Sequence, residues 1–289
     1  MNNLPKISIV TPSFNHAEFI ERTIISVVSQ TYPNKEYIIM DGGSTDGTVD
    51  IIKKYESQIV YWRSAPDEGQ TAAICDGFSK ATGDILLYLN SDDMLLPGAL
   101  WAYAEALGGK EKAWVIGRLE LVDEEDRLIA YRPAYPFSMG DLWYNLYIVH
   151  QEGTCYTRAL YEEAGGFDPS YHYSMDFHMW LRMRELCAPV LLKQFTAAFR
   201  VSENQKSADR VAYAKEANRA FGAVRKWRVE RGLSEFPKKS VLKGRMFQLA
   251  KALYYFWVGG IDVVKGIVRF RSEKKGSITT SGIIQANRS

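Results

Sequence analysis

The N-terminal third of this chain alternates between short apolar runs and segments in which apolar residues recur at helical spacing. Short apolar runs are typical of buried strands, and their alternation with helices indicates parallel strands joined by right-handed crossovers. The pattern therefore predicts an α/β fold with a mostly parallel central sheet flanked by helices. The expected strands are residues 7–11, 36–40, 59–63 and 84–89, and the helices between them are residues 17–30, 49–55 and 71–80.

Polar clusters follow three of the expected strands directly, at residues 11–15, 41–46 and 90–93. Because the carboxyl ends of parallel strands meet at one edge of a sheet, we expect the three clusters to lie together. Ligands of such sheets bind beyond that edge, so the clusters predict one shared site.

Beyond residue 98 the regular alternation is lost, although strands and helices are still expected. An acidic turn at residues 123–126 is predicted to join two strands, and Pro237 marks an expected linker. The expected strands are residues 114–121, 128–131, 153–156 and 190–195, and the helices are residues 158–164, 176–186, 208–231 and part of 137–148.

Composition and charge narrow the class of protein. The 289 residues are 46% hydrophobic and 24% charged, which is ordinary for a globular protein with one large domain and an appendage. The net charge of +2 does not indicate a nucleic-acid-binding protein, which would usually be strongly basic. Cys75, Cys155 and Cys187 have neither zinc nor disulfide spacing. No secretory signal pattern is visible at the start, so we expect a cytoplasmic location.

Two adjacent carboxylates, Asp92 and Asp93, come after the apolar run at residues 85–89. Carboxylates at a strand end can hold a hard divalent cation, which then takes diphosphate oxygens as further ligands. Such an ion would neutralise the charge on a departing nucleoside diphosphate. The alternative is that Asp93 caps a helix that begins at Met94, and acidic caps are common.

Three other acidic residues each allow two interpretations. Asp41 could accept a hydrogen bond from a nucleobase or could form an ordinary Asx turn, and Asp67 in the next loop has the same alternatives. Asp176, at the start of an expected helix, could take a proton from an acceptor hydroxyl. It could also be there because the helix dipole favours a negative charge, and spacing alone does not separate the two.

An ordered series of motifs favours the functional interpretations of these acidic residues. Through this series the chain resembles the family 2 glycosyltransferases, which have the GT-A fold. The resemblance extends from about residue 5 to residue 205 and is strongest to the branch that builds bacterial O-antigen and capsule repeat units. The series comprises IVTPSFN (9–15), SQTYPN (29–34), DGGSTDGT (41–48), PDEG (66–69), ATGD (81–84), NSDD (90–93), HQ (150–151), GGFD (165–168) and MD (175–176).

The resemblance implies a donor site for a nucleoside-diphosphate sugar. Thr11, Pro12 and Asn15 would line the nucleotide pocket. Asp41 would contact the base, typically the uracil of a UDP-sugar, with Asp67 nearby.

The resemblance also implies the catalytic apparatus. Asp92 and Asp93 match the metal-binding Asp-x-Asp (DxD) element, with Asp93 the more direct ligand of Mn²⁺ or Mg²⁺, and Asp92 also on the donor. Asp176 matches the base of an inverting transfer without a covalent intermediate. Acceptor contacts are expected from His150, Gln151, His172 and Trp180.

Some positions depart from the family pattern. Ile74 stands where many members have Arg, so the contact to the diphosphate must come from the metal or from Arg200. Ser202 stands where many members have His, which leaves a third metal ligand open. These departures keep one alternative open, a degenerate nucleotide-sugar-binding or scaffold protein. A pyrophosphorylase is disfavoured, because no Gly-rich basic loop follows the first strand. The Gln-x-x-Arg-Trp motif of polymerising members is absent, which favours non-processive transfer.

The expected organisation is a catalytic domain at 1–205, with a donor half (1–98) and an acceptor half (99–205), followed by a basic helix at 206–236. Residues 237–272 are predicted to form a basic amphipathic tail and 273–289 to be disordered. Between residues 238 and 275, ten Lys/Arg stand against two acidic residues, with an aromatic run between them. This favours a helix on the inner face of the cytoplasmic membrane, near a lipid-linked acceptor. The alternative is packing on the catalytic domain or within a homo-oligomer.

Overall fold

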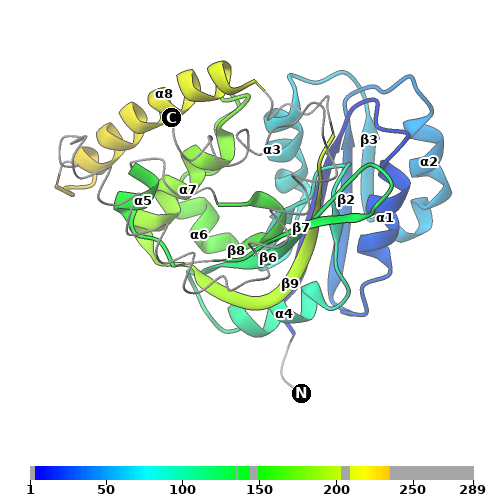
Figure 1. The fold of residues 1–289 in the computed structure, drawn as a ribbon, viewed down its shortest axis with the longest axis horizontal. Coiled ribbons are helices and arrows are strands. Elements are labelled where there is room, and N and C mark those ends of the chain that lie inside the picture. The colour runs from blue at the N-terminus through cyan, green and yellow to red at the C-terminus, as the bar shows by residue number, and fades with distance from the viewer. Residues whose placement is uncertain (1–3, 135, 144–148, 203–208, 235–289) are drawn as a thin grey trace.

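The computed structural model describes residues 4–134, 136–143, 149–202 and 209–234. In this part of the chain, nine strands form one sheet in the order β3-β2-β1-β4-β8-β6-β9-β5, with β7 paired to β6 (Figure 1). The strands are β1 (Ile7–Ser13), β2 (Lys35–Asp41), β3 (Tyr61–Ser64), β4 (Ile85–Tyr88), β5 (Met94–Leu95), β6 (Trp114–Val122), β7 (Leu128–Arg132), β8 (Thr154–Thr157) and β9 (Val190–Arg200).

The N-terminal half of the sheet is parallel, as the alternating pattern predicts. β1 pairs in parallel with β2 and β4, and β2 pairs in parallel with β3. The second half is mixed, since β8 is antiparallel to both β4 and β6, while β9 is parallel to β6. The predicted acidic turn joins β6 to β7 as an antiparallel pair. The observed sheet confirms the α/β fold class.

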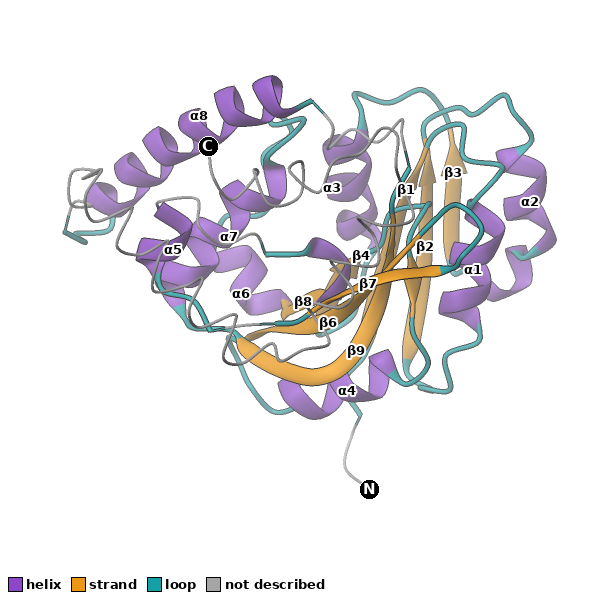
Figure 2. Ribbon diagram, viewed as in Figure 1, coloured by secondary structure: helices purple, strands orange, loops and turns teal. Residues whose placement is uncertain are grey.

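Helices cover both faces of the sheet (Figure 2). One face packs α1, α2 and α4 against residues such as Ile9, and the other packs α3, α6 and α7 against residues such as Val10. A Cβ on Gly77 in α3 would collide with Val10, so glycine allows this helix to lie close on β1. The helices are α1 (Ile20–Val28), α2 (Thr48–Lys54), α3 (Gln70–Lys80), α4 (Ala99–Leu107), α5 (Met139–Trp143), α6 (Arg158–Glu163), α7 (Met175–Leu186) and α8 (Arg210–Glu230), with 3-10 turns η1 (Glu56–Gln58) and η2 (Gln151–Gly153).

Some expectations fall outside the residues that the structure describes. The predicted domain boundary at 205, the tail at 237–272 and the disordered end at 273–289 all belong to this group. Among the described helices, none is long and apolar enough to cross a membrane. β9 extends five residues beyond the predicted strand at 190–195, because its second half pairs with both β6 and β5.

The amino edge of the sheet is held together by the buried carboxylate of Glu36. Oε1 accepts a hydrogen bond from the Ser8 hydroxyl (2.6 Å), and Oε2 accepts one from the Thr82 hydroxyl (2.9 Å) and pairs with Lys6 Nζ (2.6 Å). Burial alone would raise the pKa of Glu36, but bonds from Lys6, Ser8 and Thr82 outweigh it and lower the pKa from 4.5 to about 2. Glu36 therefore stabilises the fold as a carboxylate.

We expect Glu36→Gln to lower the free energy of unfolding by about 3 kcal/mol at neutral pH, the equivalent of a pKa lowered from 4.5 to about 2. Because the folded pKa lies below the unfolded one, this contribution is complete above pH 4.5 and is lost as the pH falls toward 2. Urea unfolding across that range should show the two proteins converging in acid. A difference in the free energy of unfolding that stays constant with pH would contradict the role of Glu36 as a stabilising carboxylate. The exposed Glu105 is the control, with an expected change below about 0.5 kcal/mol for Glu105→Gln.

Candidate functional site

The loop after β2 is organised around the buried carboxylate of Asp41. Oδ2 accepts hydrogen bonds from the amides of Gly43 (3.1 Å) and Ser44 (2.9 Å) and from the Ser64 hydroxyl (2.6 Å), and Oδ1 accepts one from the Ser44 hydroxyl (2.5 Å). Each carboxylate oxygen has about two acceptor positions, so these bonds saturate Oδ2, whereas Oδ1 accepts only from Ser44. The predicted contact between Asp41 and a nucleobase would therefore have to use Oδ1.

Asn15 connects the polar cluster after β1 to the Asp41 loop. Its amide donates to Ser44 Oγ (2.7 Å), and its side-chain Oδ1 accepts from the amide of Thr45 (2.9 Å). Asn15 has a φ of 52°, a left-handed conformation that asparagine adopts more readily than most residues. The structure thus joins the first and second predicted clusters.

Gly42 lies closely between the side chains of Phe14 and Asp67. A Cβ at Gly42 would lie 3.2 Å from Asp67 Oδ2 and 3.3 Å from Phe14 Cδ2. The Phe14 ring is 60% exposed, which is unusual for phenylalanine and suits stacking against a flat ligand. Asp67 lies beside this loop as predicted. Phe14 was not among the predicted site residues, because its letter within the strand-end motif does not reveal its exposure.

The loop that carries Asp92 and Asp93 contacts His16, the residue directly after the first cluster, and is supported by α1. His16 Nδ1 lies 2.7 Å from Ser91 Oγ. Thr23 Oγ1, on α1, lies 2.9 Å from the Ser91 carbonyl oxygen and 2.7 Å from that of Asp93. All three predicted clusters therefore meet at the carboxyl edge of the sheet.

Asp93 is buried and is held by β9. The Arg200 amide donates to Asp93 Oδ1 (3.0 Å), and Asn90 Nδ2 donates to Oδ2 (3.3 Å). The interpretation of Asp93 as the cap of a helix at Met94 is wrong, because Met94 begins β5 and α4 begins only at Ala99. Pairing with β9 overrides the helical pattern of the sequence here.

The Arg200 side chain supports the aspartate loop from inside the protein. It is 1% exposed, with Nε donating to the Asp92 carbonyl (2.9 Å) and a guanidinium nitrogen donating to the Asp123 carbonyl (2.9 Å). The same guanidinium pairs with Asp126 at 2.5 Å. A contact of Arg200 with a diphosphate stays a prediction, and it would require the side chain to leave these partners.

Glu152, which the sequence analysis did not single out, belongs to the same acidic cluster. It is 7% exposed, and its Oε2 is buried without a hydrogen-bond partner. Burial, followed by repulsion from Asp176 and Asp92, raises the pKa of Glu152 to about 8. Burial, followed by repulsion from Asp92 and Glu152, raises the pKa of Asp93 well above its usual range. Burial and mutual repulsion thus make the charged forms of Glu152 and Asp93 unfavourable when no cation is bound.

Asp176 lies at the start of α7. Repulsion from its carboxylate is one cause of the raised pKa of Glu152, after burial. The loop before α7 lies against the start of α3. Thr71 Oγ1 donates to the Tyr171 carbonyl (2.6 Å), and a Cβ on Gly69 would lie 3.8 Å from His172 Nδ1. Asp176 is also in the first helical turn, so a dipole effect and a role as base are compatible.

Gln151 and His150, both predicted to contact an acceptor, lie beside each other near the end of β4. Gln151 Nε2 donates to the Tyr88 carbonyl (2.7 Å), and Gln151 Oε1 accepts from Asn90 Nδ2 (3.1 Å). Gln151 therefore ties η2 to the end of β4. Burial, followed by repulsion from Arg132, lowers the pKa of His150 to about 3, which keeps this imidazole neutral.

The other two residues predicted to contact an acceptor, His172 and Trp180, differ in their exposure to solvent. His172 is exposed beside the Gly69 loop, where an acceptor could reach it. Trp180 is 1% exposed and stacks on Trp114, with ring centroids 5.6 Å apart. This position in the core argues against the predicted acceptor contact of Trp180.

Thr11 and Pro12 are buried within β1. The Thr11 hydroxyl accepts a hydrogen bond from the Tyr37 hydroxyl at 3.0 Å, so its side chain is directed into the protein. A nucleotide pocket that includes these residues would use the backbone rather than their side chains. Ile74 is fully buried in the core, so its side chain offers no contact to a diphosphate.

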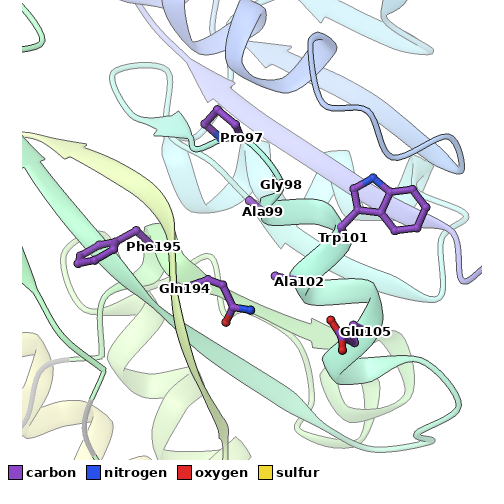
Figure 3. Close-up of a pocket in the computed structure, with 8 residues that line it drawn as sticks. All are labelled: Pro97, Gly98, Ala99, Trp101, Ala102, Glu105, Gln194 and Phe195. Atoms are coloured by element: carbon purple, nitrogen blue, oxygen red, sulfur yellow. The ribbon is translucent and has the colours of Figure 1, made fainter.

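A cavity of about 430 Å³ lies away from the predicted site residues, between the N-terminal part of α4 and the strand β9 (Figure 3). Its lining includes Pro97, Trp101, Glu105, Gln194 and Phe195 and none of the predicted site residues. The carboxylates at the sheet edge therefore remain the candidate site, because they combine buried charge with several converging loops.

Comparisons of sequence agree with the motifs. Residues 8–165 match the profile described as glycosyl transferase family 2. An uncharacterized glycosyltransferase of Mycobacterium tuberculosis is 32% identical over 198 residues, which cover 67% of this chain and 74% of that protein. A putative teichuronic acid biosynthesis glycosyltransferase of Bacillus subtilis, TuaG, is 38% identical over 94 residues, 31% of this chain and 36% of that protein.

Comparisons of structure agree with the fold. TarS 1–349 of S. aureus in complex with UDP-GlcNAc has a TM-score of 0.61 at 15% identity, covering 97% of this chain and 79% of that chain. The mannosyltransferase PcManGT of Pyrobaculum calidifontis in complex with GDP-Man and Mn²⁺ has a TM-score of 0.58 at 16% identity, covering 98% of this chain and 79% of that chain. At these identities the likeness establishes the fold, and it confirms the expected GT-A architecture.

Proposed function

The chain belongs to glycosyltransferase family 2, and from this premise we propose that it is an inverting, metal-dependent, non-processive enzyme. It moves one sugar at a time from a nucleoside-diphosphate donor to a hydroxyl of a saccharide or lipid-linked glycan. The donor is a UDP-sugar, as the resemblance of the strand-end motifs implies.

One observation carries this proposal above all: three separate segments, the loop of Asp92 and Asp93, η2 with Glu152 and the start of α7 with Asp176, bring carboxylates near enough to raise pKa values among them. The pKa of Glu152 rises through burial first and then through Asp176 and Asp92, which places these carboxylates in one electrostatic environment. Such a concentration of buried charge is costly for folding, and it is expected where charge is used for binding or catalysis.

The residues at this edge fit a divalent cation such as Mn²⁺ or Mg²⁺. Glu152 Oε2 is buried without a partner, and burial raises the pKa of Asp92 despite the attraction of His16 and Arg200. Within the described residues, no three His, Cys, Asp or Glu side chains form a complete metal site. An ion held by Asp93 and Asp92 would take its other ligands from a diphosphate and water. When bound, the ion would neutralise charge on the leaving diphosphate.

The donor nucleotide is proposed to lie over the loops that follow β1, β2 and β3. The exposed Phe14 ring offers a stacking surface, and Asp67 lies near it across Gly42. A donor site of this kind is supported by the related folds, since TarS is described with UDP-GlcNAc and PcManGT with GDP-Man and Mn²⁺.

Transfer is proposed to proceed by a single in-line displacement. Asp176 takes the proton of the acceptor hydroxyl as its oxygen attacks the anomeric carbon. The new glycosidic bond forms while the bond to the diphosphate oxygen breaks, and that electron pair leaves with the nucleoside diphosphate. One displacement inverts the anomeric configuration without a covalent intermediate.

We propose that the product belongs to a bacterial surface polysaccharide and that the enzyme acts at the inner face of the cytoplasmic membrane. The similarity to TuaG supports polysaccharide synthesis. The ten Lys/Arg between residues 238 and 275 support attraction to anionic lipid, at about 1 kcal/mol for each basic residue near the surface. A homo-oligomer that buries this segment remains the alternative.

Thermal unfolding with a panel of UDP-, GDP- and dTDP-sugars, with and without Mn²⁺, tests the donor proposal. A donor at a hundredfold excess over its Kd stabilises a protein by about 2.7 kcal/mol, so we expect UDP-sugars with Mn²⁺ to raise the Tm by roughly 5–10 °C. EDTA should remove most of this shift. A larger shift with GDP- or dTDP-sugars would refute the UDP assignment, and binding without donor hydrolysis or transfer would favour a degenerate scaffold protein.

A further inference from the structure

Helix α8 packs across α7, the helix that carries Asp176 (Figure 1). The Phe221 ring of α8 contacts the Phe177 ring of α7 edge-on, with centroids 5.2 Å apart. The buried apolar residues of α8 are Ala217, Ala220, Phe221 and Val224. α8 is therefore fixed against the element that presents the proposed base.

One side chain of α8, Glu216, binds the loop that leads into α7. Its Oε1 accepts a hydrogen bond from the amide of His172 (3.0 Å), and its Oε2 accepts from the amides of Tyr173 (2.7 Å) and Ser174 (3.0 Å). Three successive amides thus converge on one carboxylate, in the arrangement by which backbone nests hold anions. Burial would raise the pKa of Glu216, but these three hydrogen bonds outweigh burial and lower it, so the group is a carboxylate.

The start of α7 lacks the side-chain cap that helices usually have. Ser174 is at the N-cap position, yet its side chain makes no capping hydrogen bond, and its Oγ is buried without a partner. Helix starts leave several amides unpaired, and Ser at this position normally accepts from one of them. Here Glu216 fixes the entry to the helix from a distance of 42 residues along the chain.

A second side chain of α8 holds the same loop further upstream. Arg219, three residues after Glu216, donates to the Ser170 carbonyl (2.6 Å), and its guanidinium lies 3.8 Å from the centre of the Tyr171 ring. The Tyr171 carbonyl in turn accepts from the Thr71 hydroxyl at the start of α3. The loop is therefore fixed between α8 and the donor half of the protein.

We propose that Glu216 is a positioning residue for sugar transfer, because it fixes the loop at residues 172–174 and with it the direction of Asp176. The inference rests on the proposed function of Asp176 as the base. Asp176 is two residues from Ser174, the last residue whose amide Glu216 binds. If these amides lose their acceptor, the first turn of α7 can unwind and the base moves. A displacement of about 1 Å can slow a reaction by up to about a hundredfold.

Glu216→Gln is the sharpest variant, because glutamine has the same size but one acceptor oxygen in place of two. We expect kcat to fall about tenfold, which is less than the hundredfold effect of a full 1 Å displacement of the base. The donor KM and the donor-induced Tm shift should stay unchanged. Glu230→Gln is the matched control, since Glu230 is exposed on the same helix and pairs only weakly with Lys226 (3.7 Å). Equal kcat values for Glu216→Gln, Glu230→Gln and the unmodified protein would overturn the proposal.

A double variant separates positioning from a general loss of structure. If Glu216 acts through Asp176, then Glu216→Gln should cause no further loss in an Asp176→Asn protein. Losses that multiply would overturn the proposal. The failure of the base assignment looks different, since Asp176→Asn alone would then transfer sugar at the rate of the unmodified protein.

Hydrogen exchange provides a readout that does not depend on transfer activity. Exchange at the amides of His172, Tyr173 and Ser174 should be at least about tenfold faster in Glu216→Gln and unchanged in Glu230→Gln. If all three amides keep their protection in Glu216→Gln, Glu216 does not hold the loop and the proposal fails.

Discussion

Replacing Asp93 by Asn is expected to abolish metal-dependent transfer while the apo protein keeps or gains stability. Burial, followed by repulsion from Asp92 and Glu152, raises the pKa of Asp93, so its charge is unfavourable when no cation is bound. Asn removes that charge and retains an oxygen that can accept from the Arg200 amide, now 3.0 Å from Oδ1, and it loses only the longer bond from Asn90 Nδ2 (3.3 Å). We expect the free energy of unfolding to change by at most about 1 kcal/mol in the unfavourable direction.

Transfer activity of Asp93→Asn should fall sharply, although its stability is nearly retained. Loss of a ligand from a two-carboxylate site should weaken Mn²⁺ binding and lower kcat/KM by at least about a thousandfold, since the ion stabilises the leaving diphosphate. Thermal unfolding with UDP-sugar should lose its dependence on Mn²⁺, and steady-state transfer assays measure the rate. Asp76→Asn is the control, because Asp76 is exposed and pairs with Arg63 away from the site. Turnover that stays dependent on Mn²⁺ in Asp93→Asn at an undiminished rate would remove Asp93 from the metal site.

Asp93→Ala is a less informative variant, and the structure shows why. Alanine would leave the Arg200 amide and Asn90 Nδ2 without their acceptor. A buried polar group without a partner costs about 1–3 kcal/mol. A loss of activity in Asp93→Ala could therefore come from local rearrangement of β5 and β9 as well as from loss of the metal.

The sequence predicted the sheet edge well, because local signals determine it. Each strand of β1, β2 and β4 is an apolar run that ends in polar residues, and parallel strands must align those ends. Asn15, Asp41 and Asp93 therefore lie at one edge as predicted. What each side chain does there depends on distant partners: Asp41 is occupied in part by Ser64, which is 23 residues further along the chain.

The other differences from prediction also come from packing between distant elements. Trp180 belongs to a helix with an ordinary periodic pattern, but α7 is covered by the sheet on one side and by α8 on another, so Trp180 is core. Glu152 follows a recognisable His-Gln pair, yet only the packing of η2 on β6 and β9 buries its carboxylate. Glu216 is one of two acids on a helix with a basic sequence, and no local pattern connects it to residues 172–174.

Replacing Asp176 by Asn is expected to stop transfer and leave donor binding unchanged. Asn has almost the same shape and cannot accept the proton of the attacking hydroxyl. General base catalysis contributes about 10²–10⁴-fold, so we expect kcat to fall by about a thousandfold. Donor KM and the Mn²⁺-dependent Tm shift should stay as in the unmodified protein, because the proposed donor loops follow β1, β2 and β3 and the proposed metal loop follows β4, whereas Asp176 is on α7.

The competing interpretation of Asp176 is that it only stabilises the first turn of α7, and Asp50 provides the matched test. Asp50 is in the first turn of α2, where the helix dipole acts on it in the same way, but it lies outside the site. Both Asp176→Asn and Asp50→Asn should lose about 0.5 kcal/mol of stability, and only Asp176→Asn should lose transfer. If the two variants transfer sugar equally well, Asp176 is a helix-dipole residue and the base must be another group. The buried Glu152 would then be the first to examine, because it has an unpartnered oxygen in the same acidic cluster.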